Sequence, residues 1–139
     1  MTFLDTNILL YAVTAAPEEE KKRSIARSIL RHDHLSLSVQ VLQEFYVQAT
    51  RASRPDPLSH DEACALIGHW LRFHVVPLTV SVLQNALKLK SLYPISFWDA
   101  AIVSAASAAK CNILFSEDLS HGQDYGGVKV INPFLESTP

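Results

Sequence analysis

Four carboxylates in this sequence stand beside apolar segments that are expected to be buried, and such carboxylates serve either as structural caps or as ligands for cations. The first is Asp5, which follows the apolar pair Phe3-Leu4 and precedes the apolar run Ile8–Tyr11. Asp and Asn side chains accept hydrogen bonds from the free N–H groups of a helix's first turn, so Asp5 fits a helix start. The local sequence leaves a cap and a functional carboxylate both open.

The second carboxylate, Asp118, follows another short apolar run, Ile113–Phe115. In parallel sheets, ligands bind beyond the carboxyl ends of the strands, so Asp118 lies near Asp5 if their two strands are neighbours. A polar turn after a strand is the structural alternative. Glu117 is adjacent and Asp124 is close in the sequence, so each is a further candidate for the same role.

The third carboxylate, Asp99, lies on a predicted helix. Ser96 and Asp99 form an S-x-x-D pattern, which is typical of a capping box. At about 100° per residue, however, Asp99 is bracketed by Ile102 and Val103 one turn later, and a carboxylate within an apolar stripe faces inward. Burying an unpaired charge costs on the order of several kcal/mol, so this position favours a bound cation or a raised pKa.

The fourth carboxylate, Glu44, also lies on a predicted helix. The apolar face of that helix is formed by Leu42, Phe45, Tyr46 and Ala49. Glu44 falls on the opposite side, together with Gln40 and Arg51. This side faces either solvent or a wet cleft, and in a cleft the Arg51 guanidinium would suit a phosphate. Periodicity alone does not choose between the two.

Short β-like runs alternate with longer helical segments, and these elements must position the carboxylates. The predicted strands are Thr2–Leu4, Leu35–Ser38, Val75–Leu78, Ile113–Phe115 and Val128–Ile131. Helical periodicity covers residues 20–32, 39–51, 61–73, 81–93 and 94–110. Strands that alternate with helices predict an α/β fold with a mainly parallel sheet covered on both faces.

Two segments interrupt this alternation of predicted strands and helices. The prolines at positions 55 and 57 predict a loop between two helices, and the helix restarts after Ser59, which has Glu62 at the capping-box spacing. The Gly-rich segment before the last strand indicates a turn, and its pair Gly126-Gly127 lacks the lysine of a phosphate loop. No linker or repeat divides the sequence, so residues 1–139 are predicted to form one domain.

Composition and charge exclude several classes of protein. No stretch approaches the roughly 20 consecutive apolar residues of a membrane helix, and the N-terminus does not resemble a leader, so we expect a cytoplasmic protein without membrane association. Cys64 and Cys111 form no zinc spacing and are expected to be buried thiols, and the histidines form no zinc motif. The net charge of −2 indicates that any binding of nucleic acid is local.

The charged residues and tryptophans have simple structural interpretations. Residues 18–31 concentrate Lys and Arg after three Glu, which indicates a solvated helix face with pairs such as Glu18 to Lys22. Trp70 and Trp98 are assigned to a core or an interface.

Five segments, taken together and in order, resemble one family over nearly the whole chain. They are FLDTNILLYA at 3–12, SVQVLQEFY at 38–46, SFWDAAIVSAA at 96–106, ILFSEDL at 113–119 and GVKVINPF at 127–134. These segments resemble the motifs of the PIN-domain nucleases and, more narrowly, of the VapC-type toxins of bacterial toxin–antitoxin pairs. The resemblance implies a three-layer α/β/α sandwich with a mainly parallel central sheet.

The resemblance also implies a set of site residues. It puts the family's catalytic acids at Asp5, Glu44, Asp99 and Asp118, and its polar partners at Asn7 and Ser116. Four converging carboxylates repel one another unless cations are present, and Mg²⁺ or Mn²⁺ prefers oxygen ligands. We therefore expect Asp5, Asp99 and Asp118 to bind metal in a ribonuclease that hydrolyses phosphodiester bonds.

The expected partners follow from the same resemblance. They are an RNA substrate, a cognate antitoxin that inserts a basic side chain among the carboxylates, and a second copy of the chain. Apolar helices at 8–13, 25–30 and 60–93 are candidate surfaces for the homodimer. Arg27, Arg51 and Arg54 are candidate phosphate contacts, whose loss would weaken RNA binding and its salt dependence.

Two other functions fit parts of the sequence. The tetrapeptide LDTN is similar to the haloacid-dehalogenase phosphatase motif, but that motif has a second Asp where this chain has Asn7. The second alternative is a catalytically silent PIN-fold module that binds RNA or a protein partner. Metal-dependent cleavage of RNA distinguishes the nuclease from the silent module.

Overall fold

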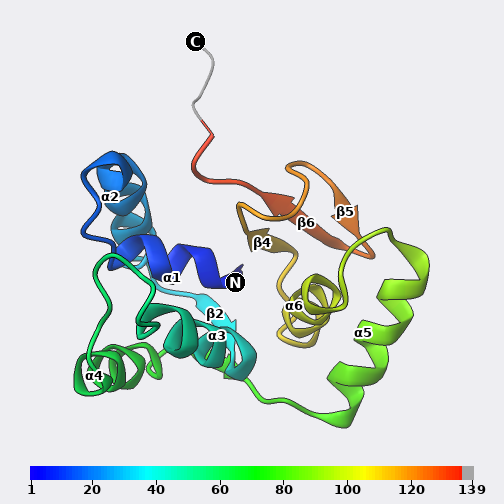
Figure 1. The fold of residues 1–139 in the computed structure, drawn as a ribbon. Helices are drawn as coiled ribbons and strands as arrows, with labels where there is room; N and C mark the ends of the chain where they lie inside the picture. The colour runs from blue at the N-terminus through cyan, green and yellow to red at the C-terminus, as the bar shows by residue number, and fades with distance from the viewer. Residues whose placement is uncertain (136–139) are drawn as a thin grey trace.

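The computed structural model describes residues 1–135, in which strands and helices alternate (Figure 1). The strands are β1 (Thr2–Leu4), β2 (Leu35–Ser38), β3 (His74–Val76), β4 (Ile113–Phe115), β5 (Asp124–Tyr125) and β6 (Val128–Ile131). The helices are α1 (Thr6–Ala12), the short 3-10 helix η1 (Pro17–Glu19), α2 (Glu20–Ile29), α3 (Val39–Ala49), α4 (His60–Trp70), α5 (Val80–Leu92) and α6 (Phe97–Ala108).

The strands form one sheet in the order β3-β2-β1-β4-β6-β5. Every neighbouring pair is parallel except β5 and β6, which are antiparallel. Figure 1 shows α5 beside α6 on one side of the molecule, and α1 to α4 on the other. The predicted α/β sandwich with a mainly parallel central sheet is therefore confirmed.

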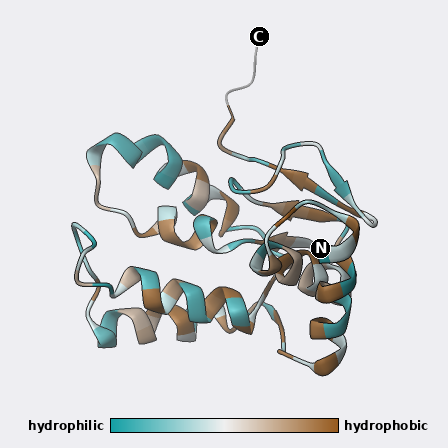
Figure 2. Ribbon diagram, turned by 45° about the vertical axis from the view of Figure 1, so that its right-hand side comes forward, coloured by the Kyte–Doolittle hydropathy of each residue, from teal (hydrophilic) through white to brown (hydrophobic). Residues whose placement is uncertain are grey.

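The core is built on the strands, which carry apolar side chains on both faces. Phe3, Leu4, Leu37, Leu114 and Val130 are all completely buried. Figure 2 shows β4 and β6 largely as apolar ribbon, whereas the helices alternate between polar and apolar stretches. Sheets covered on both faces require this pattern. Within residues 1–135, no helix is long and apolar enough to cross a membrane.

The predicted helix caps are confirmed. Ser59 and Glu62 form a reciprocal capping box at the start of α4, after the predicted proline-containing loop. The Ser96 hydroxyl accepts a hydrogen bond from the Asp99 N–H at 3.1 Å and caps α6. Asp99 is thereby fixed in the first turn of α6.

Two strand predictions were wrong. The third strand spans His74–Val76 instead of Val75–Leu78, because Pro77 has no N–H to donate to a neighbouring strand. The segment before β6 contains β5, which sequence reasoning treated as a turn. Gly126 and Gly127 both have positive φ and connect β5 to β6 as a two-residue hairpin loop, a conformation that glycine adopts without strain.

The prediction for the two cysteines was half right. Cys111 is buried, but Cys64 is exposed on α4. The buried face of α4 carries Ala63 and Trp70, which are two turns apart, and Cys64 lies one residue off that face. The two tryptophans also differ, because Trp70 is buried whereas Trp98 is 66% exposed.

Candidate active site

Asp5 lies at the end of β1, where the register of the sheet puts it beside Ser116. Leu4 pairs with Phe115 of β4, and the Asp5 N–H donates to the Phe115 carbonyl at 3.0 Å. One carboxylate oxygen of Asp5 accepts from the Thr6 N–H at 2.7 Å, and the other accepts from the Ser116 hydroxyl at 2.7 Å. Asp5 thus caps α1 and also contacts the segment that follows β4.

The Asp5 carboxylate lies in an environment that opposes its charge. Its side chain is only 4% exposed. Burial raises the pKa of Asp5 from its ordinary value of 3.8 to about 7; hydrogen bonds from Ser116 and Thr6 oppose this rise, and the charges of Asp118 and Glu44 add to it. A buried carboxylate whose charged neighbours are other carboxylates is stabilised by a cation.

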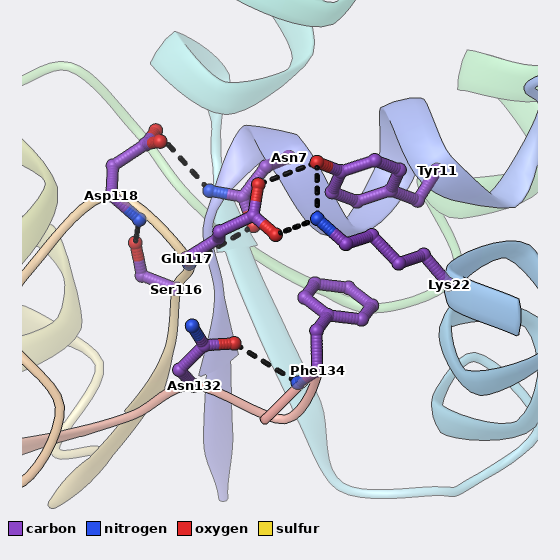
Figure 3. Close-up of polar contacts among 8 residues, drawn as sticks. All are labelled: Asn7, Tyr11, Lys22, Ser116, Glu117, Asp118, Asn132 and Phe134. Atoms are coloured by element: carbon purple, nitrogen blue, oxygen red, sulfur yellow. Dashed lines mark hydrogen bonds and ion pairs between the residues drawn. The ribbon is translucent and has the colours of Figure 1, made fainter. Parts of the chain in front are cut away.

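Asn7 connects Asp5 to Asp118. Its amide nitrogen lies 3.5 Å from Asp5 Oδ2 and 3.3 Å from Asp118 Oδ2, and its amide oxygen accepts from the Glu117 N–H at 3.3 Å. The Ser116 hydroxyl accepts from the Asp118 N–H at 3.1 Å (Figure 3). The structure therefore brings together four of the predicted site residues: Asp5 from the junction of β1 and α1, Asn7 from α1, and Ser116 and Asp118 from the turn after β4.

Glu44 approaches the same region from α3. The Thr6 hydroxyl donates to Glu44 Oε2 at 3.2 Å, and the Gln40 amide donates to Glu44 Oε1 at 2.6 Å. Of the two interpretations of this helix face, the structure supports the cleft, because Glu44 is half-buried and lines a cavity with Asn7 and Asp118.

Asp99 approaches from the first turn of α6 and is half-buried. Burial raises the pKa of Asp99, the hydrogen bond with Ser96 lowers it, and the charge of Asp118 raises it. Asp99 therefore serves the cap that its spacing predicted and also lies within electrostatic range of Asp118. It does not line the cavity that Glu44 and Asp118 share.

That cavity has a volume of about 340 Å³ and is strongly acidic. Its acidic lining residues are Glu19, Glu44, Asp56, Glu117 and Asp118, and its basic lining residue is Arg54. We call it the acid cavity. Arg51 lines a second cavity on the other side of Glu44. Arg27 lines neither of these cavities and donates to the Ala12 carbonyl at 2.8 Å.

Glu117 and Asp124 have other partners. Glu117 forms an ion pair with Lys22 at 2.5 Å and accepts a hydrogen bond from the Tyr11 hydroxyl at 2.5 Å. Figure 3 shows the Lys22 ammonium between Tyr11 and Glu117, above the Phe134 ring. The exposed side chain of Asp124 accepts from the Gly127 N–H at 2.7 Å and closes the β5–β6 hairpin. Asp124 therefore has a structural role.

The expected pairing of Lys22 with Glu18 was wrong. Glu18 lies in η1, outside α2, so the two residues do not have the spacing of one continuous helix. The pKa of Lys22 is raised mainly by its hydrogen bond to Glu117. Burial, followed by the contact with Glu117, raises the pKa of Tyr11. Sequence reasoning missed this network because 95 residues separate Lys22 from Glu117.

Two other contributors to the site were missed or undervalued. Thr6 donates to Glu44, and its place between Asp5 and Asn7 in DTN was the available signal. Gln40 lies one helical turn before Glu44, the spacing at which side chains on a helix meet.

The donor chemistry fits a hard divalent cation. Carboxylate, amide and hydroxyl oxygens are the ligands that Mg²⁺ prefers, and Mg²⁺ is commonly held by one or two carboxylates and several waters. Among residues 1–135, no group of three or more His, Cys, Asp or Glu side chains is close enough to hold one ion directly. The arrangement thus suits an ion bound by fewer protein ligands, near Asp5 and Asp118.

The sequence matches a family model described as PIN domain over residues 2–122. No curated protein matches the chain. Among solved structures, a toxin–antitoxin complex from Klebsiella pneumoniae superimposes with a TM-score of 0.69 at 18% identity, covering 96% of this chain and 98% of that chain.

Two further structures share the fold. The VapC20 toxin of Mycobacterium tuberculosis, named as cleaving the sarcin-ricin loop, gives a TM-score of 0.66 at 18% identity and covers 85% of this chain and 92% of its own. FitAcB from Neisseria gonorrhoeae gives a TM-score of 0.65 at 18% identity and covers 96% of this chain and 99% of its own. At these identities the likeness shows the fold.

Proposed function

The chain belongs to the PIN-domain family, and from this premise we propose that it is a metal-dependent endoribonuclease acting as the toxin of a toxin–antitoxin module. The observation that carries the proposal is Asp5, a buried carboxylate with a pKa of about 7 whose charged neighbours are also acids. Binding of a hard cation relieves this repulsion. The structural similarity to toxins of toxin–antitoxin pairs supports the toxin role.

In this proposal Asp5, Asp99 and Asp118 would hold Mg²⁺ or Mn²⁺ together, at least one of them through metal-bound water, because no three acids among residues 1–135 lie close enough to bind one ion directly. Such an ion, when bound, would supply Lewis-acid chemistry toward a phosphate and would lower the pKa of a bound water. Ser116 and Asn7 donate hydrogen bonds to Asp5 and so fix the direction of its outer oxygen.

Glu44 and Arg54 have separate tasks in the same proposal. Thr6 and Gln40 hold the two oxygens of Glu44 at the wall of the acid cavity, where Glu44 would orient the attacking water. Arg54 lines this cavity and would pair with a substrate phosphate, because a guanidinium matches the geometry of phosphate oxygens.

The first test is cleavage of structured and unstructured RNAs by the purified protein with Mg²⁺, with Mn²⁺ and with EDTA. We expect cleavage with either ion and none with EDTA. Asp99→Asn should lose cleavage while its circular dichroism spectrum stays that of the wild type. Asp124→Asn is the matched control. Asp124 does not line the acid cavity, and Asn keeps an oxygen for the Gly127 N–H.

One observation favours the alternative, a catalytically silent binding module. No group of three acids among residues 1–135 is preassembled around one ion. Calorimetric titration with Mg²⁺ and Mn²⁺ distinguishes the two functions. A folded protein, free of any antitoxin, that neither binds these ions nor cleaves RNA would be the silent module.

The proposed partners are an antitoxin and a second copy of the chain. The acid cavity suits a basic side chain from an antitoxin, because among residues 1–135 five acidic residues line it and only one basic residue, Arg54, does. Exposed apolar residues on α5 offer a surface for a homodimer; they are Val80, Leu83, Leu87 and Leu92. Light scattering after size-exclusion chromatography measures the oligomeric state.

A further inference from the structure

A second cavity, with a volume of about 400 Å³, adjoins the acid cavity. It lies between α3 and the start of α6. Glu44 and Gln48 line both cavities, so they form a shared wall. A chain-like ligand that passes Glu44 can therefore occupy both cavities at once. We call the second cavity the Trp98 cavity.

Trp98 is the most unusual residue of this cavity, because 66% of its surface is exposed. Large aromatic side chains are usually buried, and an exposed one beside a site indicates a contact with a ligand or partner. The Gln40 amide reaches the Trp98 carbonyl at 3.4 Å, and the Phe97 ring packs edge-on at 5.2 Å between centroids. Gln40 thus fixes the backbone at Trp98, and the Phe97 ring contacts an indole that stays largely exposed.

The polar side chains of the Trp98 cavity suit a nucleobase and its phosphate. Gln43 and Gln48 each carry an amide that can both donate to and accept from the edge of a base. Arg51 is exposed on the same cavity, and its guanidinium matches a phosphate. Single-stranded RNA is recognised in this way, by stacking on an aromatic ring and by hydrogen bonds to unpaired edges.

Charge also distinguishes the two cavities as routes for RNA. Of the residues lining the Trp98 cavity, Glu44 is acidic and Arg51 is basic. The acid cavity instead places several carboxylates against one basic residue, Arg54. A polyanion that leaves the cleavage site is therefore repelled less on the Trp98 side.

We propose that the Trp98 cavity is a nucleobase subsite, in which Trp98 stacks on an unpaired base of single-stranded RNA next to the scissile phosphate. The amides of Gln43 and Gln48 contact the edge of that base, and Arg51 contacts its phosphate. This inference rests on the proposed ribonuclease function, because that function supplies the RNA whose flanking nucleotide reaches the subsite.

The test measures binding of a fluorescein-labelled oligoadenylate about 12 nucleotides long by fluorescence anisotropy. Ca²⁺ is present to neutralise the carboxylates, and gel electrophoresis checks that the probe stays intact. Trp98→Ala should weaken binding about 5- to 100-fold, the range for loss of one base stacked on an aromatic ring. Trp98→Phe should recover most of the affinity, since a phenyl ring still stacks.

Three controls make the result specific. Leu135→Ala, at an exposed apolar residue outside both cavities and outside the proposed dimer surface, should leave the affinity unchanged. An abasic oligonucleotide should bind wild type and Trp98→Ala equally, because it has no base to stack. Arg51→Ala should reduce the salt dependence of binding by about one phosphate contact.

Two outcomes would overturn the subsite. One is equal affinity of wild type and Trp98→Ala for oligoadenylate. The other is conversion of a dimer to a monomer by Trp98→Ala with RNA affinity per chain unchanged, which would make this face a protein interface. Because the assay measures binding, it is independent of cleavage. If Trp98→Ala binds the oligonucleotide as the wild type does, the subsite proposal is wrong and the outcome of the Asp99→Asn cleavage test is unaffected. If the protein binds RNA through Trp98 but never cleaves it, only the proposed nuclease function is wrong.

Discussion

Glu117 and Asp118 are adjacent acids after the same strand, yet their surroundings are opposite. Glu117 turns toward α2, where Lys22 pairs with it and Tyr11 donates to it. Asp118 turns toward α1, where it accepts from the neutral amide of Asn7 and is otherwise exposed. Figure 3 shows both side chains leaving the same turn in different directions.

This difference indicates which acid is structural and which is available for a ligand. The charge of Glu117 is compensated by Lys22 within the protein, so the pair ties the turn after β4 to α2. The charge of Asp118 adds to the repulsion at both Asp5 and Asp99. Asp118 therefore retains a negative charge that a bound cation can use.

The largest expected effect separates these two neighbours directly. Asp118→Asn should lower metal affinity and RNA cleavage more than about 100-fold, because the proposed function makes Asp118 a metal ligand and the loss of a ligand exceeds that of a group that only supports one. Glu117→Gln is the matched change and should lower cleavage less than about 10-fold. Mg²⁺ calorimetry and single-turnover cleavage measure both. Equal losses in the two variants would contradict the distinction.

The next effect concerns the free energy of unfolding without metal. Between pH 3.8 and about 7, folded Asp5 holds a proton that the unfolded chain has released. Unfolding then releases a proton, so this group lowers the stability as the pH rises through that window. Asp5→Asn should remove this dependence and stabilise the metal-free protein at pH 8 by up to about 4 kcal/mol, the equivalent of the pKa rise from 3.8 to about 7.

Urea denaturation in EDTA at pH 4.5 and pH 8 measures this effect. The relevant quantity is the difference between wild type and Asp5→Asn at each pH, since other groups also titrate. Saturating Mg²⁺ should stabilise the wild type at pH 8 but not the variant. If the free energies of unfolding of the two proteins depend on pH in the same way, the pKa of folded Asp5 is not raised.

The smallest expected effect concerns the compensated pair. Lys22→Met and Glu117→Gln should each lower the free energy of unfolding by about 1 kcal/mol, because both side chains remain partly exposed and water screens their attraction. The double variant should lose less than the sum of the two changes. Urea denaturation measures these free energies of unfolding. If the losses of the two single variants add up in the double variant, the interaction between Lys22 and Glu117 does not stabilise the protein.

Much of the fold was accessible from local patterns. Alternating apolar runs and helical periodicity predicted the parallel sheet, and serine spacings predicted the caps of α4 and α6. The two strand errors occurred where the local pattern gave the wrong bounds for a strand or missed a strand. Pro77 shortened β3, and the Gly126-Gly127 pair formed a hairpin that paired Asp124 and Tyr125 with β6.

The sequence by itself determined which residues are candidates for the site. Short apolar runs placed Asp5 and Asp118 at strand ends, helix phase turned Asp99 inward, and the resemblance to PIN-domain nucleases assigned the three to one site. The tertiary structure decided which side chain pairs with or hydrogen-bonds to each acid. The pairing of β1 with β4 brings Asn7 to Asp118 across 111 residues, and the packing of α2 brings Lys22 to Glu117 across 95. Contacts between residues so far apart in the sequence depend on strand order and on helix packing, and local sequence periodicity encodes neither.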